Sequence, residues 1–173
     1  MAILGKFTKQ PIEVEIYAIQ FADDMPPTDS IAGGHQVVTH NGKATGTLIL
    51  SAPYTATLND DHKVLRTTAG VTLPAGAADG YTIYVGNVNQ SAGIFADSIS
   101  IPARGSAIIV RTAGAWITEV TAQGIIVAAP RDQRVRIVFT GGFDGQTYKA
   151  ELTAMTSEGR TMQDELLIKV REF

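Results

Sequence analysis

The sequence predicts an all-β protein in which antiparallel sheets pack face to face. Glycine and proline interrupt almost the whole chain of 173 residues, and the longest stretch without either, residues 54–69, is rich in Thr, Asn and Asp. An α-helix of ordinary length therefore has little room. Several segments alternate apolar and polar residues with a period of two, which is typical of strands with one buried and one solvated face.

The first alternating segment lies near the N-terminus, where a strand is expected over residues 12–19. Its apolar residues Ile12, Val14 and Ile16 alternate with glutamates. We expect these three apolar side chains to face the core. The C-terminal strands described next have an apolar face that must be buried. We therefore expect the N-terminal strand to pair within the same sandwich as these strands.

The C-terminal part of the chain predicts a meander of three strands, at residues 134–140, 146–155 and 162–171. Each strand alternates apolar residues with charged residues or Thr. The loops that join them, 141–145 and 156–159, have the length and the glycines of hairpin turns.

The middle of the chain, residues 37–120, is expected to form an inserted β module in a sandwich domain built from 1–36 and 121–173. Charge is sparse here, and short strands rich in Thr, Ile and Val alternate with turns containing Ala, Gly and Pro. The runs 81–88 and 107–111 are almost continuously apolar or Thr, which is typical of strands covered on both sides. Because a module of this size buries only part of its surface alone, we expect a homo-oligomer, or docking on another protein, to cover the rest.

Composition excludes several classes of function. With 14 basic and 17 acidic residues, the net charge of −3 argues against direct binding of nucleic acid. The lack of cysteine excludes a disulfide scaffold, a thiol nucleophile and a thiolate metal site. Lys6 and Lys9 interrupt the apolar start too early for a signal peptide, and no segment has the apolar length of a membrane span. We expect a soluble chain made in the cytoplasm.

No constellation of side chains predicts catalysis, a cofactor or a metal site. His35 and His40 lack a metal-binding spacing, and together with His62 they are expected to lie in exposed loops. The acidic segments 23–24 and 59–62 are interpreted as solvated turns, because neither has the ligand pattern of a calcium loop or of a carboxylate pair across a cleft. The sequence also lacks phosphate-binding glycine motifs and nucleophile elbows. We therefore expect a protein that is not an enzyme.

Seven residues are candidates for an interface: Tyr81, Ile83, Tyr84, Ile109, Trp116, Arg134 and Arg136. The first four lie in the apolar runs of the module, so replacing Ile83 or Ile109 by Asp is expected to weaken assembly before it unfolds the sandwich. Trp116, the single tryptophan, is either a core anchor or an interface hot spot. Arg134 and Arg136, with Arg131 nearby, either meet an acidic partner or line a solvated strand face.

The two ends of the chain carry a further pattern. It comprises residues 3–11 and 29–32 at the start, and 139–148, 156–161 and 164–172 at the end, including the motif GG-x-x-G-x-x-Y at 141–148. In this order the segments resemble small virion proteins of tailed bacteriophages, the fibre-tail adaptors. The resemblance implies an immunoglobulin-like sandwich and a non-enzymatic role in attaching tail fibres to the tail.

The module carries a resemblance of its own. Residues 71–76, 80–88, 101–107 and 114–117 are similar to β modules in phage fibres and spikes, which implies a trimer. This insertion departs from the usual adaptor, so a capsid decoration protein that cements the head lattice is an alternative. A carbohydrate-binding module is a lesser one, using the following residues as a stacking platform: Tyr54, Tyr81, Tyr84 and Trp116. The expected partners are other virion proteins of the tail, fibre or capsid, with no nucleic acid and no membrane.

Overall fold

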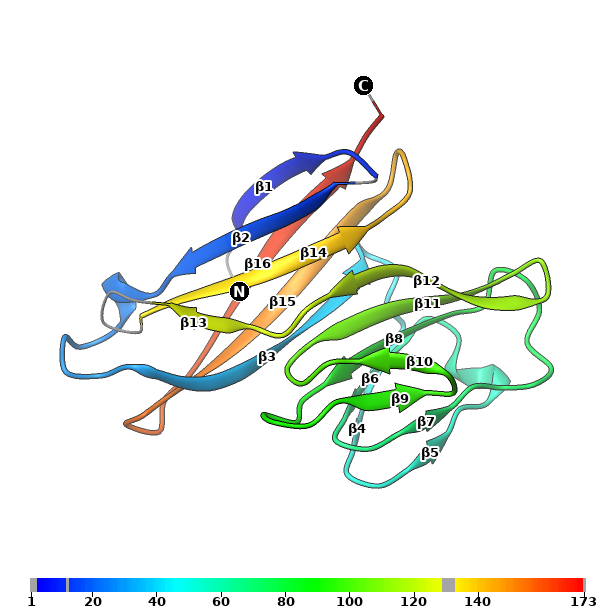
Figure 1. Ribbon diagram of the computed structural model, residues 1–173, viewed down its shortest axis with the longest axis horizontal. Coiled ribbons are helices and arrows are strands. Elements are labelled where there is room, and N and C mark those ends of the chain that lie inside the picture. The colour runs from blue at the N-terminus through cyan, green and yellow to red at the C-terminus, as the bar shows by residue number, and fades with distance from the viewer. Residues whose placement is uncertain (1–2, 12, 129–132, 173) are drawn as a thin grey trace.

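The structure is a computed structural model that describes residues 3–11, 13–128 and 133–172. In these ranges the chain forms strands and two short 3₁₀ helices, η1 (Ala22–Asp24) and η2 (Leu58–Asp60). The predicted all-β class is therefore confirmed. Figure 1 shows two lobes side by side, a sandwich made by the chain ends and a module made by the middle of the chain.

The first sheet of the sandwich has the order β1 (Ile3–Lys9), β16 (Thr161–Val170), β15 (Thr147–Thr156) and β3 (Ile31–His40). β1 runs parallel to β16, and the other neighbours are antiparallel. The facing sheet contains β2 (Val14–Gln20), which pairs along β14 (Arg134–Gly141). The other side of β14 is shared by β13 (Ile126–Ala128) and β12 (Ala115–Ala122). The prediction that the N-terminal strand joins the C-terminal strands in one sandwich is confirmed.

The predicted three-strand meander is wrong in one connection. β15 and β16 form the expected hairpin, but β14 lies in the opposite sheet, so the loop at 141–145 crosses between the two sheets. Gly141 and Gly142 both have positive φ, at 88° and 105°, which allows the chain to leave one sheet for the other. The crossing places the apolar face of β14 opposite that of β15, so that each covers the other.

The predicted orientation of the N-terminal strand is also wrong. Val14 and Ile16 are 60% and 61% exposed, whereas Tyr17 and Ile19 on the other side of the strand are buried. Ile12 lies outside the described residues. Side chains alternate across a strand, so only one set can face the core, and the set that continues through Tyr17 and Ile19 to Phe21 buries more apolar surface.

The module is a small two-layer solenoid. The chain alternates between β4 (Gly46–Leu50), β6 (Lys63–Thr67) and β8 (Thr82–Asn87) in one layer and β5 (Tyr54–Thr55), β7 (Val71–Thr72) and β9 (Ile94–Ala96) in the other. Within each of these sets of three the strands are parallel. β10 (Ile99–Ile101) closes the outer layer, and β11 (Ser106–Thr112) joins β8 to β12.

Two hydrophobic cores result, one on each side of the long central sheet. The first lies between the two sheets of the sandwich and extends under the module to Tyr84 and Ile108. The second lies between β6, β8 and β11 and the outer layer of the solenoid, and contains Ile83 and Ile109. Every residue of β8 is buried. The prediction that this run and that of β11 are covered on both sides is confirmed, but other parts of the same chain cover them.

The module and the sandwich are joined through shared strands. The expected boundaries at 37 and 121 fall inside β3 and β12, because β3 packs directly on β8 and β12 pairs with both β11 and β14. At the contact, a Cβ on Gly86 would collide with Val37. The backbone NH of Val38 donates to Ser106 Oγ at 3.1 Å, and Ser106 Oγ donates to Gln36 Oε1 at 2.8 Å. Buried hydrogen bonds therefore hold the two lobes in one orientation.

Candidate interface

The central sheet has one face that the rest of the described chain leaves uncovered. Its inner face packs in the sandwich core, and the solenoid covers its outer face only in the module. On β2, β13 and β14, the side chains that point away from the core therefore reach solvent. We call this surface the open face, and it consists of Val14, Ile16, Ala18, Ile126, Arg134, Arg136 and Val138.

The open face is mainly apolar. Ile126 on β13 is 51% exposed, and Val14 and Ile16 on β2 are more than half exposed as well. The strand register places Ala18, Arg136 and Ile126 in one row across three strands, with Ile16 and Val138 in an adjacent row. Contiguous exposed apolar side chains of this kind are typical of a surface that binds another protein.

The charge on the open face comes from arginine. Arg134 donates from Nε to the side-chain oxygen of Gln20 at 3.1 Å. Among the described residues, neither Arg134 nor Arg136 forms an ion pair. The predicted Arg131 lies outside the described residues. Guanidinium groups beside exposed aliphatic side chains suit a partner with both apolar side chains and carboxylates.

The other five predicted interface residues lie in the module. Tyr81, Ile83, Tyr84 and Ile109 are buried within the chain, which explains their apolar sequence without a partner. Trp116 is partly buried at the start of β12. The centroid of its ring lies 5.7 Å from the ring centroid of Tyr81 and 5.2 Å from Cζ of Arg111. Of the seven candidates, only the two arginines come together on the open face.

Sequence reasoning missed the aliphatic residues of the open face. Val14 and Ile16 were assigned to the core, and Ile126 had no signal that distinguished it from a buried residue. The available signal was the row of apolar residues that follows Ile16, since Tyr17 and Ile19 compete for the core on the opposite side of the same strand.

The expectation of exposed loop histidines is wrong for His35 and His40, which lie in β3 and are only partly exposed. His40 Nε2 donates to Glu119 Oε1 at 2.8 Å, and its Nδ1 contacts the hydroxyl of Tyr84 at 2.9 Å. The hydroxyl of Tyr148 donates to the same oxygen of Glu119. Burial raises the pKa values of Tyr84 and Tyr148 well above the usual range of a tyrosine.

This cluster joins four strands. Its side chains come from β3, β8, β12 and β15, and they meet where the sandwich and the module touch. Each polar group in it is engaged by another, and Tyr148 also accepts a hydrogen bond from the backbone NH of Phe143 at 2.8 Å. The arrangement supports a structural role. Nearby in β3, burial and the charge of Arg66 lower the pKa of His35 to about 4.

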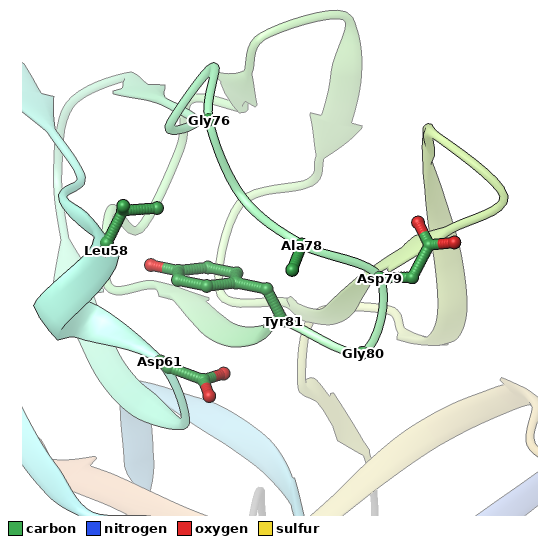
Figure 2. Close-up of a pocket in the computed structure, with 7 residues that line it drawn as sticks. All are labelled: Leu58, Asp61, Gly76, Ala78, Asp79, Gly80 and Tyr81. Carbon is green, nitrogen blue, oxygen red and sulfur yellow. The ribbon is translucent and has the colours of Figure 1, made fainter.

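One hollow lies in the module, among the turns around η2 and the start of β8 (Figure 2). It has a volume of about 500 Å³, and the ring of Tyr81 lies at its centre between Leu58 and Ala78. Its carboxylates are already engaged: Asp61 accepts from the NH of Thr82 at 2.9 Å, and Asp79 accepts from the NH of Gly114 at 2.9 Å. The hydroxyl of Tyr81 donates to the carbonyl of Thr57 at 2.7 Å. The hollow is therefore explained by the packing of turns.

In the part of the chain that the structure describes, no group of three or more His, Cys, Asp or Glu side chains is placed to hold a metal ion. Among the same residues, no helix has the length and apolar character needed to cross a membrane.

Part of the chain matches a known protein family. The model of the family described as Gp77, Podophage GP4 fiber-tail adaptor protein gp77, matches residues 101–169. The chain is similar to phage fibre-tail adaptors. The matched stretch runs from the end of β10 almost to the end of β16, and it contains four of the seven residues of the open face. A search of the curated proteins found no match.

The similarity to fibre-tail adaptors confirms the resemblance that the sequence predicted for the C-terminal part. It is consistent with a structural adaptor of the phage tail, and it does not favour the capsid decoration protein or the carbohydrate-binding module. The burial of Tyr81 and Tyr84 also removes two of the four aromatic residues from the suggested sugar platform.

Proposed function

We propose that this chain is a non-enzymatic adaptor that attaches tail fibres to the tail of a podophage, and that the open face is one of its docking surfaces. The observation that carries the proposal is the family match over β11 to β15 and most of β16. Ile126, Arg134, Arg136 and Val138 all belong to this matched stretch. The shared part of the chain thus carries an exposed apolar surface with two arginines that form no ion pair among the described residues.

The partner of the open face is a different virion protein. If two copies of the chain met through this face about a twofold axis, arginines would be brought near arginines, which is unfavourable. A tail or fibre protein that presents aliphatic side chains and carboxylates would instead pair with Arg134 and Arg136 and cover Ile16 and Ile126. Arginine is among the residues that contribute most to such interfaces.

The fold suits a protein that carries mechanical load. An adaptor must transmit force between a fibre and the tail without changing its angle. Here the central sheet runs without a break from β2 in the sandwich to β4 in the module, and Gln36 and Ser106 connect the lobes by buried hydrogen bonds. The protein would be synthesised in the host cytoplasm and would function in the virion.

The proposal is tested by complementing a phage that lacks this gene with variants of the open face. Ile16→Asp and Arg136→Glu are expected to give heads and tails of normal appearance that carry few fibres, as counted by electron microscopy. Leu58→Asp serves as the matched control, because Leu58 is 58% exposed at the far end of the module. Normal fibre numbers with both open-face variants would contradict the proposed docking surface. Normal fibre numbers without the gene would contradict the adaptor function itself.

A further inference from the structure

The solenoid ends without a cap. β4 pairs with β6 only and β5 pairs with β7 only among the described strands, so both layers stop at the same place. Figure 1 shows β5 at the lower edge of the module. We call residues 46–55 the terminal coil. None of its residues is buried, and neither is any residue of the loop at 41–45 that precedes it.

The terminal coil lacks the charges that usually protect a sheet edge. Residues 44–58 contain no Asp, Glu, Lys, Arg or His. Natural proteins block free edges with charged side chains, proline, bulges or a covering loop, because the free NH and CO groups pair readily with another strand. Here β4 contains no charge and no proline, and Pro53 lies between β4 and β5.

The terminal coil also leaves part of the module core uncovered. Leu48, Leu50 and Tyr54 point toward the core of the solenoid but are only partly buried, because no further coil lies over them. On the other side of β4, Ile49 is 84% exposed. In stacked repeat structures each unit covers its neighbours, so a terminal unit with exposed apolar residues indicates a missing neighbour.

We infer that the terminal coil pairs with the terminal coil of a second copy of this chain. The occupant must supply two strands at once, one for each layer. A copy rotated by 180° about an axis perpendicular to the layers supplies both, placing β4 antiparallel to its counterpart in one layer and β5 antiparallel to its counterpart in the other.

The terminal coil and the open face differ in charge, and only the terminal coil suits pairing with a second copy. Self-pairing of the terminal coil brings no like charges together, since both strands are uncharged, whereas self-pairing of the open face would bring arginines together. Backbone hydrogen bonds between the β4 strands supply affinity, and Leu48 and Leu50 become covered. The inference concerns the chain by itself and does not rest on its role as a fibre-tail adaptor.

Sedimentation velocity on the purified full-length chain tests the pairing. The wild type is expected to be a dimer at concentrations on the order of 10 μM. The variant Thr47→Lys/Ile49→Lys places like charges at the edge on two exposed positions, and we expect it to need a roughly tenfold higher concentration to dimerise or to stay monomeric. Phe95→Lys is the control, because Phe95 is 59% exposed in the same module but lies on β9. The control is expected to dimerise like the wild type.

Hydrogen exchange distinguishes this pairing from association elsewhere. Amide protons of β4 are expected to exchange more slowly at dimeric than at monomeric concentrations in the wild type, with no change in the lysine variant. A wild type that stays monomeric up to about 200 μM would overturn the inference. So would a dimer whose concentration-dependent protection falls on β2 or β1, or one that the lysine variant leaves intact while its circular dichroism is unchanged.

Discussion

Glu119 is the residue on which the junction between sandwich and module depends. Its carboxylate is buried and accepts hydrogen bonds from His40 and Tyr148, which come from two strands of the first sheet. Glu119 lies far from both partners along the chain, so these contacts could not be predicted from the sequence. Such a carboxylate stabilises the fold chiefly because its removal leaves buried donors without an acceptor.

Glu119→Ala is therefore expected to lower the free energy of unfolding by about 3 kcal/mol, since it leaves two buried donors unpaired. Urea denaturation at neutral pH measures this change, and Glu172→Ala at an exposed position is the control. A loss no larger than that of the control would contradict the structural role of the cluster.

A second residue, Asp29, makes the fold sensitive to acid. Burial favours the neutral carboxyl, but hydrogen bonds from the backbone NH groups of Ser30 and Glu158 and from the hydroxyl of Ser157 outweigh it, and the pKa of Asp29 lies below its usual range. Because the folded-state pKa is the lower one, the stabilisation is present above the unfolded-state pKa and is lost as the pH falls through the folded-state value.

Asp29→Asn is expected to destabilise the protein at pH 7, with a difference from the wild type that shrinks as the pH drops below about 4. Thermal unfolding between pH 7 and pH 3 measures the difference. A constant difference over this range would show that the charge of Asp29 contributes nothing.

At the scale of single elements, β2 is the most informative strand. Successive side chains of β2 point to opposite faces of the sheet, and the structure places Ile16 in solvent and Ile19 in the core. Ile19→Ala is expected to cost about 2–4 kcal/mol, since it removes a buried side chain. Ile16→Ala is expected to change stability by no more than about 0.5 kcal/mol. Equilibrium denaturation of the pair checks this, and the reverse order would restore the orientation that the sequence predicted.

Most of the longer strands could be predicted from the sequence, because their alternation extends over six residues or more. The orientation of β2 could not, because apolar residues occupy both faces where Ile16, Tyr17 and Ile19 follow one another. The connection after β14 was also hidden, since a glycine loop of hairpin length can cross between sheets as well as turn within one. β5 and β7, with two residues each, are too short to show any period.

Only part of the candidate interface could be predicted from the sequence. Alternation along β14 predicted the solvated side of Arg134 and Arg136, and the structure agrees. Ile83 and Ile109 were selected because a continuous apolar run indicates cover on both sides. The sequence could not indicate that the cover comes from the outer layer of the solenoid and from β3.

At the scale of the whole molecule, the shared central sheet predicts cooperative unfolding. Ile83→Asp places a charge in a fully buried position, and we expect a loss of more than about 4 kcal/mol. Because the module and the sandwich share strands, the loss is expected to lower the unfolding temperature of both lobes together. This differs from the expectation, based on sequence, that assembly would weaken first.

Two probes follow the lobes separately during thermal unfolding of the wild type and of Ile83→Asp. Fluorescence of Trp116 reports on the module core, and far-ultraviolet circular dichroism reports on all strands. Coincident transitions are expected in both proteins. A module that unfolds while the sandwich remains folded would contradict the rigid junction proposed for the adaptor.

The central claim is that this protein connects fibres to the tail, and its place in the virion tests that claim most directly. We would fuse a compact label to the C-terminus, assemble labelled virions and locate the label by electron microscopy. The account predicts density where the tail fibres join the tail. Label density over the capsid lattice, with none at the tail, would contradict the account.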